Sequence, residues 1–137
     1  MRGVNWAAVV VAALVMQAIG FLWYGVIFEQ QWIALSGVPA ESASNTGMML
    51  GFVNTLVMAV GLGWAVPRMG GMSWGSGAVN GALLAIFFAC TTAAMGFIYG
   101  GRDTGLIPLE FGYLIVVCLV GGAIIGGLKF GRSASTV

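Results

Sequence analysis

Residues 4–28 read VNWAAVVVAALVMQAIGFLWYGVIF, an apolar run of 25 residues that only Asn5 and Gln17 interrupt. A helix of about 20 apolar residues is long enough to cross the hydrocarbon core of a bilayer. The run exceeds the apolar centre of a cleavable signal peptide, which has about 7 to 15 residues, and no small-residue cleavage site follows before Glu29. We therefore expect a membrane-spanning helix that is retained in the protein.

Three more apolar runs follow, at 46–66, 77–99 and 106–128. We expect Asn45 to cap the second helix and Pro67 to close it, because proline lacks the backbone N–H that a helix interior needs. The connectors at 29–45, 68–76 and 100–105 are too short to form domains. The sequence predicts an all-α polytopic membrane protein in which a bundle of four transmembrane helices forms a single domain over residues 1–137.

Composition supports the membrane assignment and narrows the chemistry. Of the 137 residues, 60% are hydrophobic and 7% are charged, whereas soluble domains have about 25% charged residues. The net charge is +1 and no basic cluster exists, so we expect no nucleic-acid partner. There is no histidine, and Cys90 and Cys118 lie inside apolar runs, where free cysteine acts as a small hydrophobic residue. We expect no catalytic residues, no metal site and no cofactor.

Aromatic and basic residues indicate the orientation. Trp and Tyr prefer the membrane interfaces, and two sets mark opposite ends of the four helices: Trp6, Trp64 and Trp74 at one end, and Trp23, Tyr24, Trp32 and Tyr99 at the other. The end that holds both termini carries Arg2, Arg68, Lys129 and Arg132, whereas the other end carries only Arg102. Because positive charge concentrates on the cytoplasmic side, we expect both termini to lie in the cytoplasm.

Two segments of the chain resemble each other. Residues 18–25 read AIGFLWYG and residues 94–100 read AMGFIYG, and both end the predicted helices on the same side. The similarity favours two tandem helical hairpins, related by an axis along the membrane normal as in parallel-repeat transporters. Glycine, phenylalanine and interfacial tyrosine also recur by chance in membrane helices, so both interpretations stay open.

Several motifs together resemble domain-of-unknown-function family 1761. They are Asn5-Trp6, Leu22-Trp23-Tyr24-Gly25 with Phe28 and Trp32, Gly37, Gly100-Gly101-Arg102, and Gly112-Tyr113. The chain departs from the family pattern where glycine replaces the acidic residue before Gly-Arg, and where Leu114 stands in place of a common histidine. The resemblance implies a small bacterial membrane protein with about four spans, and on that resemblance we expect it in the bacterial inner membrane. It implies no activity.

Glu110 is the sharpest candidate for a functional residue. It lies four residues into the fourth predicted helix, about 6 Å below the helix end. A carboxylate at that depth faces protein or water, or finds a partner. It can pair with Arg102 and fix the turn, reach water at the interface, or serve as a proton or substrate site, and all three interpretations stay open. With Tyr24 and Tyr113, these two residues form the candidate polar cluster.

The remaining polar and small residues suggest helix packing. Gln17, Asn54 and Asn80 lie at different depths, so we expect them to form hydrogen bonds between helices rather than one ligand site. Glycines at four-residue spacing occur at 47 and 51, 77 and 81, and 122 and 126. Small residues let helices approach closely in lipid. We expect Gly121, Gly122, Gly126 and Gly127 to make the fourth helix a contact face, within the bundle or between protomers.

The first connector is expected to contain further helix. Residues 29–35 are amphipathic enough to continue the first helix or to lie at the interface, and Gly37 followed by Pro39 should end that segment. Trp32 would anchor it there, although the segment could also be a lid or a docking surface.

Three functional hypotheses follow. The first is a non-catalytic accessory or oligomerising membrane component, which works as a homo-oligomer or within a larger membrane complex. The second is a small oligomeric transporter or channel for a small solute or protons, with Glu110 and the amides along its path. The third is a lipid-active enzyme, for which no nucleophile with a base is apparent.

Overall fold

A computed structural model describes residues 3–37 and 44–128. Four of its helices are long and apolar enough to span a membrane: Trp6–Ile27, Asn45–Arg68, Trp74–Tyr99 and Thr104–Gly127. No strand occurs in these two ranges. The prediction of an all-helical polytopic fold is therefore confirmed. The expectations for Arg2, Pro39, Lys129 and Arg132 fall outside the described residues.

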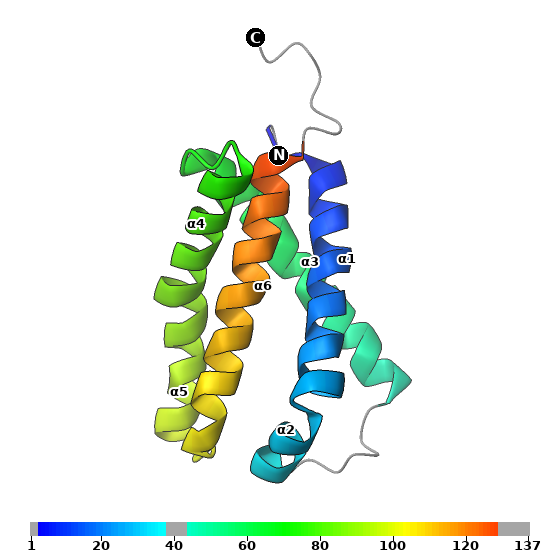
Figure 1. The fold of residues 1–137 in the computed structure, drawn as a ribbon, viewed down its shortest axis with the longest axis vertical. Helices are drawn as coiled ribbons and strands as arrows, with labels where there is room; N and C mark the ends of the chain where they lie inside the picture. The colour runs from blue at the N-terminus through cyan, green and yellow to red at the C-terminus, as the bar shows by residue number, and fades with distance from the viewer. Residues whose placement is uncertain (1–2, 38–43, 129–137) are drawn as a thin grey trace.

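The four spans contain departures from regular α-helix (Figure 1). Helix α1 (Trp6–Leu22) passes into a π-helical turn, η1 (Trp23–Ile27), and then into the short α2 (Glu29–Ser36). Helix α3 (Asn45–Arg68) forms the second span. The third consists of α4 (Trp74–Leu84), a second π-helical turn, η3 (Ala85–Cys90), and α5 (Thr91–Tyr99). A 3₁₀ turn, η4 (Thr104–Leu106), leads into α6 (Ile107–Gly127).

The ends of α3 differ from those expected. Ser44, not Asn45, is the N-cap, and its side chain accepts a hydrogen bond from the backbone N–H of Gly47. At the other end Pro67 lies inside the last turn, and the helix continues to Arg68. Proline removes only its own N–H, so the following residues can still donate to the preceding turn. The N–H of Met69 does so, 3.0 Å from the carbonyl of Ala65.

Local capping also moves two other helix starts. The third span begins at Trp74 rather than Gly77, because Ser73 and Ser76 form a reciprocal capping box that satisfies the first backbone N–H groups. The fourth begins with the 3₁₀ turn at Thr104 rather than at Leu106, because the Asp103 side chain accepts from the N–H of Gly105. Helix α2 ends at Ser36, and its C-cap is Gly37, whose φ of 69° is a conformation that favours glycine.

Helix α6 is the centre of the bundle and contacts α1, α3 and α4, most extensively α4. Small residues bring α4 and α6 together. A methyl group built at Gly77 would overlap the carbonyl oxygen of Gly122, and one at Gly81 would overlap that of Cys118. Helix α1 also packs beside α3. The pairs α1 with α3 and α4 with α6 are the pairs that tandem hairpins require, whereas internal duplication stays a prediction.

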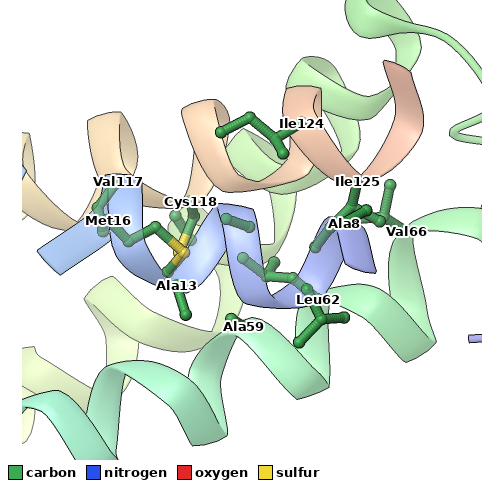
Figure 2. Packing of buried hydrophobic residues seen from close by; sticks show 13 residues of the cluster. Ala8, Ala13, Met16, Ala59, Leu62, Val66, Val117, Cys118, Ile124 and Ile125 are labelled. Atoms are coloured by element: carbon green, nitrogen blue, oxygen red, sulfur yellow. The ribbon is translucent and has the colours of Figure 1, made fainter. Parts of the chain in front are cut away.

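The buried core lies where α1, α3 and α6 meet (Figure 2). Helix α1 contributes three alanines and Met16, which is fully buried, and α6 contributes Val117 and Ile125. Figure 2 shows Met16, Ala13 and Cys118 close together, with Ala59 and Leu62 of α3 below them. Because alanine side chains are small, the three helices approach closely without large interlocking side chains. Gly121 of α6 has the same role, since an added methyl group would lie 2.7 Å from the sulfur of Met16.

Both ends of the described chain lie at one end of the bundle. The Asn5 side chain caps α1 through the N–H of Ala8 and donates from Nδ2 to the carbonyl of Leu128, 3.0 Å away. The opposite end of the bundle, with α2, η4 and the start of α6, is called the distal end below (bottom of Figure 1). The candidate polar cluster lies at the distal end.

The distal half of α3 leaves the bundle. Figure 1 shows α3 crossing behind α6 and α1, with its N-terminal end beyond α1. Residues 44–51 are all exposed, and Met48 exposes 54% of its surface although it shares a helix face with the buried Thr55, Ala59 and Leu62. Gly47 and Gly51 also lie here, and an added methyl group at Gly51 would meet nothing within 4 Å. This glycine pair makes no helix contact within the described chain.

Candidate functional site

An ion pair between Arg102 and Glu110 is the centre of the distal cluster. The guanidinium meets the carboxylate with two parallel contacts, Nη1 to Oε1 at 3.0 Å and Nη2 to Oε2 at 2.6 Å. Bidentate contacts of this kind fix the orientation of both groups. The side chains keep 38% and 22% of their surface exposed, respectively. The pair ties the connector after α5 to the first turn of α6 and is partly open to its surroundings.

The end of α5 positions Arg102. The aliphatic part of the side chain lies over Gly96, where an added methyl group would come 3.3 Å from Cδ. The guanidinium lies over the ring of Phe97, 4.6 Å from the ring centroid. Gly101 adopts a φ of 65°, which lets the chain reverse directly before Arg102. The hydrogen bond that Arg102 donates to the Glu110 carboxylate raises the pKa of the guanidinium.

Tyr24 and Tyr113 lie next to this pair. Their rings meet edge to face with centroids 4.9 Å apart. Tyr24 is close enough to Glu110 and Arg102 to interact electrostatically with both. The Tyr113 hydroxyl packs against Gly20 of α1, where an added methyl group would lie 3.1 Å from the oxygen. The structure therefore brings the four predicted residues of the candidate polar cluster into one region.

The π-helical turn η1 supplies the aromatic part of this region. Trp23 donates from Nε1 to the carbonyl of Leu109 at 3.0 Å, which joins the end of the first span to α6. Its ring packs against Phe28 and Tyr113. Trp32 of α2 meets the edge of Tyr24. π-helical turns are rare in proteins overall, but those that occur are often at functional sites. The turn η1 is therefore a feature of interest, and apolar periodicity does not reveal it.

An apolar groove of about 590 Å³ lies between α3 and the η3 and α5 segment, and residues of α6 also line it. Met58, Gly61 and Ala65 line it from α3, and Thr92 from α5. Glu110 also lines this groove and, among the residues that the structure describes, is the only charged one to do so. Glu110 therefore borders an apolar space and pairs with Arg102.

The predicted amides do not converge on this groove. Gln17 pairs with Thr55 across α1 and α3, with 3.0 Å between Oε1 and Oγ1. Asn80 donates from Nδ2 to the carbonyl of Met69, 3.1 Å away, and so joins α4 to the end of α3. Asn54 is exposed on the distal half of α3. Asn5 joins the start of α1 to the end of α6.

The two cysteines and the predicted glycines of α6 lie where helices pack together. Cys90 and Cys118 are both buried and free, and the Cys118 thiol lies 3.8 Å from the sulfur of Met58. On α6, Gly122 and Gly126 face the backbone of α4 and the turn before it, and Gly127 faces the ring of Trp74. Within residues 3–37 and 44–128, no three His, Cys, Asp or Glu side chains are grouped to hold a metal ion.

Comparison with known proteins gives one match. A family model described as "Protein of unknown function (DUF1761)" matches residues 7–126. The match includes η1, the groove and the whole polar cluster. No curated protein and no solved structure matches the chain.

Proposed function

The chain belongs to the family described as protein of unknown function, DUF1761, and on that premise we propose that it is a non-catalytic accessory or oligomerising component of a membrane. We further propose that this membrane is the bacterial inner membrane and that both termini lie in the cytoplasm. Arg68 supports this orientation, because it lies at the end of α3 where the described chain starts and ends. A reporter fused to the C-terminus and active only in the cytoplasm would test the orientation.

The proposal rests on the exposure of the distal half of α3, which no other helix of the described chain covers. Asn54 lies nine residues into this helix, about 14 Å from its start. Its amide is exposed on a membrane-spanning segment. A polar amide that faces lipid loses hydrogen bonds that water would supply, so such residues usually face another helix. Gly47, Gly51 and Asn54 lie on one helix face and offer a partner close backbone approach and an amide to bond.

The test is native mass spectrometry of the full chain, extracted in a mild neutral detergent. We expect a homo-oligomer or a constant larger partner. Asn54→Val should shift the distribution toward the monomer, because valine keeps the helix but removes the amide. Thr91→Val is the matched control: Thr91 is also exposed on a span, but its hydroxyl already bonds the carbonyl of Phe87 in its own helix. A monomer without partner at every protein concentration would overturn the proposal.

A transporter or channel has weaker support. Gln17, Thr55 and Asn80 bond to other helices and so do not leave a line of polar groups across the membrane. The groove beside Glu110 is the one observation in favour of this alternative. Proton or solute flux in liposomes that disappears in Glu110→Gln would favour it over the accessory role.

A further inference from the structure

The groove between α3 and α5 combines an apolar wall with a single carboxylate. Its walls come from membrane-spanning segments, so a ligand can reach it from the hydrocarbon region. The volume of about 590 Å³ lies in the range of small-molecule sites. Glu110 lies in the first turn of α6, near the distal end, whereas Leu62 and Cys118 line the groove deeper in the bundle. The groove thus has a charged end and an apolar end.

Charge selects the ligand class. The described charged residues at the distal end are Glu29, Arg102, Asp103 and Glu110, three negative and one positive. A phosphate or carboxylate head would meet net negative charge there, whereas an ammonium or other organic cation would meet a complementary field. Of the two partners of the ion pair, Glu110 lines the groove and Arg102 does not.

We propose that this groove binds an amphipathic organic cation, with its apolar body between α3 and α5 and its positive charge on the Glu110 carboxylate. The inference goes beyond the proposed accessory function and does not require it, because one chain supplies the whole groove.

The ion pair permits such binding. A carboxylate has about four lone-pair directions, and Arg102 uses two of them. Both partners are partly exposed, and exposed pairs exchange partners at small cost. Thr92 and the exposed ring of Phe88 also line the groove and add a hydroxyl and an aromatic face. An aromatic face attracts organic cations. Arg102 would then act as a competitor that a ligand cation displaces or shares.

Two hydrophobic ions of the same shape and opposite charge provide the probe. Binding of tetraphenylphosphonium and of tetraphenylborate to the full chain in neutral detergent is measured by equilibrium dialysis. We expect saturable binding of one phosphonium per chain, and binding of the borate at least about tenfold weaker, which is about 1.4 kcal/mol. Equal binding of the two ions would overturn the proposal, because a purely apolar groove does not distinguish them.

Variants locate the site. Glu110→Gln should weaken phosphonium binding at least about tenfold, whereas Arg102→Gln should strengthen it by removing the competing cation. A merely structural role of the pair would make both variants weaken binding. Gly61→Leu should also reduce binding, because Gly61 lines the groove and a side chain there would enter open space. Gly75→Leu is its control, since Gly75 also has open space but lies outside the groove.

Two further results would overturn the inference while leaving the proposed function intact. One is phosphonium binding that Glu110→Gln leaves unchanged in a protein of normal helical content. The other is a phospholipid, or the α3 helix of a second copy, that blocks the groove in the native mass spectrum or in crosslinks from position 61. The oligomeric state is measured on the same samples, so the two proposals fail separately.

Discussion

Replacing Gly81 by alanine should destabilise the bundle, because Gly81 lies where α4 and α6 touch backbone to backbone. The added methyl group would overlap the Cys118 carbonyl oxygen, lie 2.9 Å from its carbonyl carbon and lie 3.2 Å from the Cα of Gly122. Carbon atoms pack at about 3.5 to 4.0 Å. None of these atoms belongs to a flexible side chain, so the two helices must move apart by roughly 1 Å. A gap of about 0.5 to 1 Å already forfeits a quarter to a half of each contact.

The expected cost follows from this separation. Overpacking a well-packed interior costs about 1 to 3 kcal/mol, and the interface between α4 and α6 is the most extensive in the bundle. We therefore expect Gly81→Ala to lower the free energy of unfolding by about 2 to 3 kcal/mol. The measurement is unfolding in mixed micelles of a neutral detergent and dodecyl sulfate, followed by the helical circular dichroism signal.

Gly75→Ala is the control, because Gly75 lies in the same helix and an added methyl group there meets nothing within 4 Å. Alanine is a better helix former than glycine by about 1 kcal/mol in water, so this variant should be neutral or more stable. The difference between the two variants isolates the contact with α6. Equal stability of Gly81→Ala and Gly75→Ala would refute the close approach of α4 and α6.

Three smaller effects are also expected in the same unfolding assay. Asn5→Ala should cost about 1 to 2 kcal/mol by removing the cap of α1. Asn5→Asp keeps the cap acceptor but loses the bond to the carbonyl at the end of α6. Full stability of the aspartate variant would contradict a role for that bond. Thr55→Val should cost about 0.6 kcal/mol by removing the bond to Gln17, and no loss would show that the pair adds nothing to the contact of α1 with α3. A double-mutant cycle on Arg102 and Glu110 should give a coupling of about 0.2 to 1 kcal/mol, because the pair is partly exposed; a coupling of several kcal/mol would mean that the pair is buried in the membrane protein.

The helix ends show why local chemistry limited the prediction. The apolar runs located all four spans, since a hydrophobic stretch has few alternatives to a membrane helix. The predicted N-cap Asn45 and the predicted helix start at Gly77 were wrong. In both helices a serine hydroxyl, of Ser44 or of Ser73, satisfies the first backbone N–H groups at an earlier position. The π-helical turns η1 and η3 could not be read from periodicity, because one extra residue in a turn leaves an apolar helix equally apolar.

The sequence predicted the four residues of the candidate polar cluster but not the groove beside them. Arg102 and Glu110 lie eight residues apart on either side of a helix start, which made an ion pair a reasonable hypothesis. Tyr24 and Tyr113 were expected at the same end of the bundle because they lie at the matching ends of their own predicted helices. The groove depends on the divergence of α3 from α5, and no local pattern encodes the angle between two helices. The bond from Asn5 to Leu128 could not be predicted, because the two residues are 123 positions apart in the sequence.

By itself, the sequence determined that this protein has four membrane-spanning helices, because 60% hydrophobic residues in four long runs leave lipid as the only suitable solvent. Glycine spacing further indicated which faces could pack closely, and two of the three spaced pairs do so. Only the tertiary structure decided which helix is central, which glycines are used and where the chain leaves an opening. Those outcomes depend on the simultaneous fit of helices far apart in sequence: α4 against α6 uses the pair at Gly77 and Gly81, whereas the pair at Gly47 and Gly51 lies on the part of α3 that the bundle does not cover.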